Sequence, residues 1–148
     1  MPMSASRPRI DKRLIGTWRS DRARTLRTFT PRPSISPESV RRFKALFGKL
    51  VIRWGRGVYR TNCDGFRSAE KYAVVASDAS SVVIKARGPL GPDPELRQIF
   101  FDGDYYWIAL GGGVCEYFRR VPRGSPNQAM QRTRGKAKRT RASKVASR

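Results

Sequence analysis

The chain has 148 residues, which is enough for one domain with a substantial core but not for two. It carries 32 Lys and Arg residues against 11 Asp and Glu, giving a formal net charge of +21, and it has no histidine. The lack of histidine excludes Ser-His-Asp and Cys-His nucleophilic sites and histidine-ligated metals. We therefore expect a protein that is not an enzyme and holds no metal or cofactor, with catalysis by an interior Tyr or Lys as the remaining alternative.

The positive charge is unevenly distributed. Residues 1–13 hold four Lys and Arg against one acid, residues 22–60 hold eleven against one, and residues 123–148 hold nine and no acid. Such a field attracts polyanions, so we expect non-specific contact with nucleic acid or an anionic membrane surface. Residues 1–13 are predicted to be disordered. Residues 122–148 have few apolar side chains and predict a disordered basic tail, either a nucleic-acid arm or an extension without a selected role.

Two further observations concern location and redox state. No segment is apolar enough for a signal peptide or a membrane span, so we expect a cytoplasmic protein. Cys63 and Cys115 lie far apart and lack CxxC spacing. They predict two reduced thiols rather than a zinc site or a disulfide framework.

The first predicted elements are a strand over residues 15–19 and one or two helices. A short helix over residues 21–27 would be capped by Ser20. A second helix is better marked, because Ser36 suits the N-cap and Pro37 the first helical position. Its apolar stripe comprises Val40, Phe43 and Phe47.

Strand and turn patterns dominate the rest of the domain. Asp102-Gly103 suits a two-residue hairpin, and other runs are separated by Gly, Asn, Asp and Pro. The runs cover residues 49–54, 58–61, 66–76, 82–87, 96–101, 105–110 and 114–121. They predict a mainly β domain over residues 14–121, an antiparallel up-and-down meander of about eight strands closed as a barrel. An open sheet packed on a helix is the competing solution.

Motifs at the two ends of this domain carry a family resemblance. The domain opens with Leu14-Ile15-Gly16-Thr17-Trp18 and closes with Tyr117-Phe118-Arg119-Arg120, with the helices and the meander between. This arrangement resembles the lipocalin-like barrels of the calycin superfamily. The resemblance implies a closed barrel that binds a small hydrophobic ligand without catalysis.

The resemblance also implies a structural lock. In that family, a Trp of the first strand packs at the closed end of the barrel under an Arg of the last strand. Trp18 would take the first role. If Glu116 faces water, alternation along the last strand points Arg119 inward and Arg120 outward. We therefore predict a lock between Trp18 and Arg119.

The same alternation predicts the barrel interior. Arg53, Arg60, Lys85 and Arg97 are taken to face solvent, so their neighbours face inward. The candidate ligand pocket is then aromatic with a few polar groups, which is typical of binding sites. It comprises Trp54, Tyr59, Thr61, Tyr72, Gln98 and Tyr117. The same residues could instead form a filled core, in which case the function would lie on the basic surface.

The second helix predicts a basic lid. Arg41, Arg42 and Lys44 lie away from its apolar stripe, where they would meet an anionic membrane or partner. The alternative function is a nucleic-acid-associated or anionic-surface-associated basic protein that uses residues 22–60 and the tail to contact phosphates.

Overall fold

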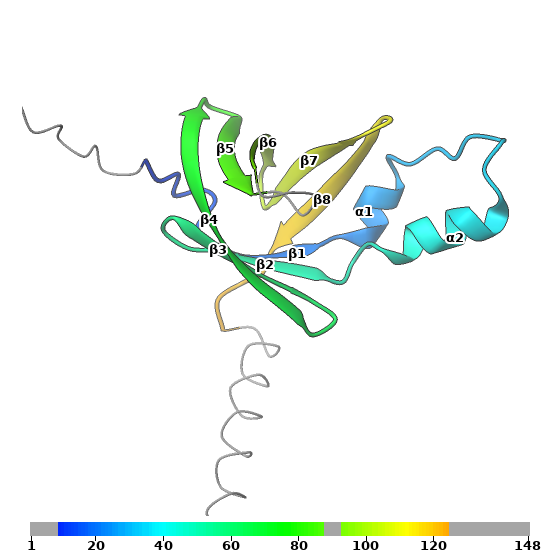
Figure 1. Cartoon of the computed structure of the whole chain (residues 1–148), viewed down its shortest axis with the longest axis horizontal. Coiled ribbons are helices and arrows are strands. Elements are labelled where there is room, and N and C mark those ends of the chain that lie inside the picture. The colour runs from blue at the N-terminus through cyan, green and yellow to red at the C-terminus, as the bar shows by residue number, and fades with distance from the viewer. Residues whose placement is uncertain (1–8, 88–92, 125–148) are drawn as a thin grey trace, which may run out of the picture.

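The chain forms a closed barrel of eight strands in which every strand runs antiparallel to its neighbours (Figure 1). The strands follow chain order, and β8 returns to pair with β1. In this computed structural model, residues 9–87 and 93–124 are described. The strands are β1 (Gly16–Ser20), β2 (Leu50–Trp54), β3 (Val58–Cys63), β4 (Phe66–Ser77), β5 (Ser81–Arg87), β6 (Pro94–Asp102), β7 (Tyr105–Gly111) and β8 (Val114–Arg120). The predicted meander barrel is confirmed, and the open sheet is excluded.

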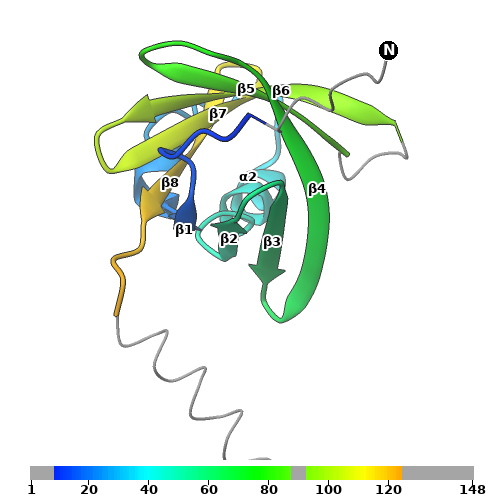
Figure 2. The same ribbon diagram turned by 90° about the vertical axis from the view of Figure 1, so that its left-hand side faces the viewer.

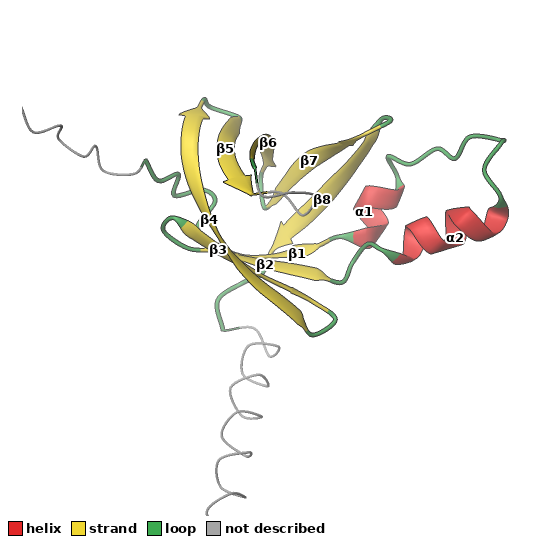
Figure 3. Cartoon of the chain, viewed as in Figure 1, coloured by secondary structure: helices red, strands yellow, loops and turns green. Residues whose placement is uncertain are grey.

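Both helices lie between β1 and β2, as predicted (Figure 3). The α1 helix (Arg22–Leu26) is capped by Asp21, whose side chain accepts a hydrogen bond from the Arg24 amide. The expected cap, Ser20, instead accepts a hydrogen bond from the Gly48 amide. The α2 helix (Pro37–Ala45) begins as predicted, with the Ser36 hydroxyl accepting from the Ser39 amide.

The two ends of the barrel differ. We call one the closed end, which has the tight connections at residues 55–57, 78–80 and 102–104 and the start of β1. We call the other the open end, where the helices extend beyond β1 and β2 (Figures 1 and 2). Within the described chain, the register between β6 and β7 covers only Phe100 to Asp102 and Tyr105 to Trp107, next to their shared turn. The two strands therefore pair near the closed end and not toward the open end.

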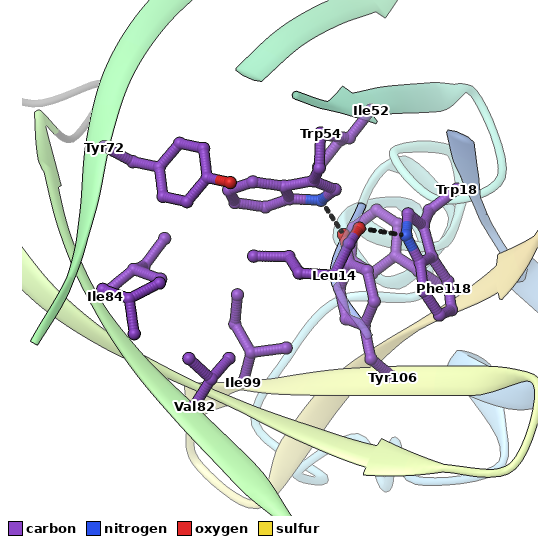
Figure 4. Close-up of a cluster of buried hydrophobic side chains, with 11 residues drawn as sticks. Leu14, Trp18, Ile52, Trp54, Tyr72, Val82, Ile84, Ile99, Tyr106 and Phe118 are labelled. Carbon is purple, nitrogen blue, oxygen red and sulfur yellow. Dashed lines mark hydrogen bonds between the residues drawn. The ribbon is translucent and has the colours of Figure 1, made fainter. Parts of the chain in front are cut away.

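The core fills the closed half of the barrel (Figure 4). Trp18, Tyr106 and Phe118 lie at its centre, each 1% exposed. The Tyr106 ring packs against both neighbours, with centroid distances of 4.6 Å to Trp18 and 4.8 Å to Phe118. Aliphatic side chains from the segment before β1 and from β5 and β6 complete this cluster, among them Leu14, Val82, Ile84 and Ile99.

The predicted terminal segments differ in outcome. Residues 1–8 and nearly all of the predicted basic tail lie outside the described residues. Residues 11–13, which were predicted to be disordered, form part of the closed end. The Arg13 side chain pairs with Asp11 at 2.7 Å and donates hydrogen bonds to the carbonyl oxygens of Ala79 and Ser81. The ordered domain therefore begins before Leu14.

Candidate functional site

The closed end is fastened by Arg120. Its guanidinium lies 4.3 Å from the centroid of the Trp18 ring and donates hydrogen bonds to the carbonyl oxygens of Ile15 (3.0 Å) and Arg13 (2.6 Å). The Trp18 indole in turn donates to the Leu14 carbonyl at 2.9 Å. One side chain of the last strand thus holds the first strand and the segment before it.

The lock uses Arg120 in place of the predicted Arg119. Arg120 pairs in register with Trp18 and shares its inner face, whereas Arg119 pairs with Arg19 and is exposed on the outer face. The prediction was wrong because it assumed that Glu116 faces water. Glu116 lies on the inner face, which shifts the alternation of the whole strand by one residue.

Gly16 completes the lock. A Cβ atom at this position would lie 2.8 Å from the Arg120 Nη1 atom, and its φ of +134° disfavours other residues. The short spacing from Gly16 to Trp18 in the opening motif therefore has a geometric cause. The glycine gives the guanidinium room to reach the backbone beside the indole.

Two of the predicted pocket residues belong to the filled core. Trp54 is 5% exposed and Tyr72 is 7% exposed. The Trp54 indole donates a hydrogen bond to the Tyr106 hydroxyl at 3.2 Å, and the Tyr72 hydroxyl donates to the Gly55 carbonyl. Burial raises the pKa of Tyr72, so its hydroxyl keeps its proton more firmly than usual. These side chains fill the barrel interior toward the closed end.

Apolar side chains at the open end are only partly covered. Leu50, Tyr59, Ala86 and Ile108 pack against the core cluster and remain half-buried. We call these four residues the open-end floor. Tyr59 itself starts opposite Trp54, but its hydroxyl reaches the Arg87 carbonyl oxygen (3.4 Å) at the end of β5. The predicted pocket residue Thr61 lies on the same inner face, opposite Ile52, and its hydroxyl forms a hydrogen bond with the Ser68 hydroxyl. The floor is therefore an apolar surface inside the barrel that solvent still reaches.

Gln98 and Tyr117 lie on the outer face, contrary to the prediction. Gln98 pairs with Val83, and its amide nitrogen donates to the Ser81 hydroxyl at 3.1 Å. Tyr117 pairs with Trp107. The assumption that Arg97 faces out was wrong, because Arg97 pairs with the buried Ile84 and shares its inner face. Toward the open end the inner face is solvated, so a charged side chain there does not mark the outside.

Arg97 and Glu116 make the open end polar above the floor. Burial raises the pKa of the Glu116 carboxyl, while the hydrogen bond from Ser20 (2.9 Å) and the Arg97 charge act in the opposite direction. Burial likewise raises the pKa of Tyr59. The Glu70 charge adds to this rise, whereas the Arg97 charge acts against it. Sequence reasoning missed both Arg97 and Glu116. The apolar residues Ile99 and Phe101 on β6, and Val114 and Phe118 on β8, would have identified the inner face of each strand correctly.

The predicted basic lid is an exposed helix. Arg41 and Arg42 are exposed, and Arg42 pairs with Glu38 one turn away at 2.8 Å. Lys44 is half-buried, and its carbonyl accepts a hydrogen bond from the Arg22 side chain. The inner side of α2 is held by aromatic contacts, from Phe43 to Phe29 (4.6 Å) and to Phe47 (5.1 Å).

Among the described residues, no group of three or more Cys, Asp or Glu side chains is placed to hold a metal ion. Cys63 and Cys115 are unbridged and half-buried. No helix in residues 9–87 or 93–124 has the length and apolar character needed to cross a membrane.

Comparison with known proteins adds no further assignment. No protein-family model, curated protein or solved structure matches the chain. The interpretation of the site therefore depends on its own geometry, an eight-stranded antiparallel barrel with a locked closed end and a partly exposed apolar floor at the open end.

Proposed function

We propose that this protein is a lipocalin-like binding protein that takes a small apolar ligand into the open half of its barrel and does not act on it chemically. The observation that supports this proposal is the open-end floor. Leu50, Tyr59, Ala86 and Ile108 face the barrel interior, contact the core and remain partly exposed. Concave apolar surface with a few polar groups around it is the usual lining of a ligand site.

The packed core limits the size of the ligand. Trp54 and Tyr72 fill the closed half, so a ligand would be confined to the open half of the barrel. We therefore expect a compact apolar group rather than an extended chain. Burying such a group would contribute about 25 cal/mol per Å² of apolar surface removed from water.

The charges around the floor favour an uncharged ligand. Arg97 shares the inner face with Glu116, and by register also with Glu70, opposite Tyr59, and Glu95, opposite Ala86. Three carboxyl groups accompany one guanidinium there. An anionic ligand such as a fatty acid would meet repulsion as well as attraction, so we expect weak selection for an acidic head group.

The α2 helix supports a role as a lid. It has no fully buried residue, and its aromatic contacts are to Phe29 and Phe47 rather than to the barrel centre. It can therefore move without disturbing the core. Arg41 and Arg42 on its exposed side would place the open end against an anionic surface from which an apolar ligand is delivered.

The test is a titration of the delipidated full chain with the neutral dye Nile red. We expect saturable binding that an uncharged apolar competitor displaces. An Ala86→Phe substitution fills the space above the floor and should weaken dye binding at least about tenfold, whereas Ala73→Phe adds the same group on the outer face of the adjacent strand and should leave it unchanged. The proposal fails if the wild-type chain shows no saturable binding, or if both variants bind the dye like the wild type.

A further inference from the structure

A row of aromatic side chains crosses the outer face of β6, β7 and β8. Phe100 pairs with Trp107, and Trp107 pairs with Tyr117, while Tyr105 lies one row nearer the closed end. We call these four residues the outer aromatic strip. The alternate residues on these strands, such as Ile99, Tyr106 and Phe118, fill the core. The strip therefore lies outside the barrel, where a core function does not explain it.

The strip is ordered and only partly covered. Its four side chains are half-buried, and the Phe100 and Trp107 rings stack with a centroid distance of 4.1 Å and an interplanar angle of 12°. Trp107 and Tyr117 are farther apart, at 6.3 Å and 37°, so they do not stack on one another. Aromatic rings fixed in this way offer preformed surface for another planar group at little entropic cost.

Arginines lie along the Tyr105 and Tyr117 side of the strip. The Arg24 guanidinium lies 4.0 Å from the Tyr105 ring centroid and 4.9 Å from that of Tyr117. Arg119 lies 6.0 Å from the Tyr105 ring and pairs across the strands with Arg19. Within the described chain, Arg24 forms an ion pair with Asp102 at 3.2 Å, whereas Arg19 and Arg119 form none. Two guanidinium groups beside the strip thus remain available to an anion.

A groove leads away from the strip along the seam between β1 and β8. Its volume is about 670 Å³, and its walls carry the side chains of Arg19, Arg22 and Arg119 as well as Asp21 and Asp104. The Asp21 carboxylate already accepts the hydrogen bond of the Arg24 amide. Positive charge therefore predominates along this path, as it does in the whole chain.

We propose that the outer aromatic strip and this groove bind single-stranded nucleic acid, with bases stacked on Trp107 and its neighbours and phosphates held by Arg19 and Arg119. Alternating stacking surfaces and guanidinium groups are what a flexible polyanion with planar bases requires, since every base has a face to stack and every link carries a charge. An acidic protein partner could also pair with the two arginines, but it would not present a planar group and a charge at each successive position along its chain. This inference is independent of ligand binding inside the barrel.

The experiment combines two signals on the full chain. Fluorescence anisotropy of labelled fifteen-nucleotide oligo(dT) or oligo(U) measures binding, and quenching of tryptophan fluorescence reports stacking. Trp18 and Trp54 are buried in the core, so quenching by the oligonucleotide reports Trp107, the third of the three tryptophans. We expect salt-dependent binding accompanied by quenching, and the two oligonucleotides distinguish DNA from RNA as the preferred strand.

Variants separate the strip from the basic chain ends. Trp107→Leu should weaken binding at least about fivefold, whereas Trp107→Tyr, which keeps a stacking surface, should retain most of it. Arg119→Gln should weaken binding and lower the salt slope by about one, while Arg67→Gln removes an equal charge in the same row of residues about 19 Å farther around the barrel and should have a smaller effect. Circular dichroism establishes that each variant is folded. If Trp107→Leu does not fold, the binding of Trp107→Tyr and of the two Gln variants tests the proposal instead.

Several results would overturn the proposal. Binding without quenching, or binding that Trp107→Leu and Arg119→Gln leave unchanged, would assign the affinity to the basic chain ends. Absence of binding, or binding insensitive to salt, would contradict the mechanism directly. A concentration-dependent dimer that Trp107→Leu dissociates would show instead that the strip is a contact between two copies of the chain.

Discussion

Arg120 joins three parts of the chain with one side chain. Its guanidinium covers the Trp18 ring and donates hydrogen bonds to two backbone carbonyl groups before β1. A lysine would retain the charge but not the planar fork that reaches both carbonyl oxygens. The contribution of this residue to stability therefore combines a cation–π contact with hydrogen bonds from a charged donor.

Substituting Arg120 tests the lock. We expect Arg120→Ala to lower the free energy of unfolding by about 2 kcal/mol, because it removes the cation–π contact and leaves two carbonyl groups without their donor. Arg119→Ala, one residue earlier on the outer face, should cost less than about 0.5 kcal/mol. Urea unfolding of both variants measures the difference, and equal losses would show that the lock is not specific to Arg120.

At the scale of elements, the hydrophobic runs and turns predicted every strand. The chain order of the strands and the start of α2 also followed from the sequence, because Ser36, Pro37 and the Gly-containing turns act locally. The face that each residue presents was harder to predict. On β6 and β8 the phase was anchored on Arg97 and Glu116, which lie on an inner face that solvent reaches from the open end.

Because the inner and outer faces of β6 and β8 were exchanged, part of the candidate site was predicted wrongly. The error exchanged Arg119 for Arg120 and placed Gln98 and Tyr117 inside the barrel. Alternation determines which residues share a face but not which face is buried. That choice requires one residue per strand whose burial is known. Fully apolar positions such as Ile99 and Phe118 are better anchors than charged ones in a barrel with one open end.

The α2 helix should open independently of the barrel. Ser36→Ala removes the hydroxyl that accepts a hydrogen bond from the Ser39 amide. Such an N-cap contributes about 1 kcal/mol to helix stability. Because α2 has no fully buried residue, we expect faster amide hydrogen exchange across Pro37–Ala45 with little change in the melting temperature. A matched loss of global stability would show that the helix unfolds together with the barrel.

For the whole molecule, closure depends on the pairing of the first strand with the last. In residues 9–87 and 93–124, every strand lies between Gly16 and Arg120, and β8 pairs with both β7 and β1. Without β8, two strands would lose a neighbour and the core would lose Phe118. The barrel is therefore expected to fold as a single cooperative unit.

Truncation tests this cooperativity. A chain that ends after Gly113 lacks β8 and should show no cooperative thermal transition, because an open seven-stranded sheet exposes both its edges and its core. A chain that ends after Gly124 retains all eight strands and should keep the transition. Circular dichroism melting of the two chains gives the comparison, and a cooperative melt without β8 would contradict the expected dependence on closure.

The antiparallel seam between β1 and β8 also sets how the molecule responds to mechanical force. β1 starts and β8 finishes at the closed end, so a pull on the two chain ends loads the two strands from the same side. Their hydrogen bonds then break one pair after another rather than all at once in shear. The hydrogen bond from the Val121 amide to the Thr17 carbonyl oxygen stands first in that order, directly followed by the contact between Arg120 and Trp18, so the barrel would begin to unzip at this lock under tension.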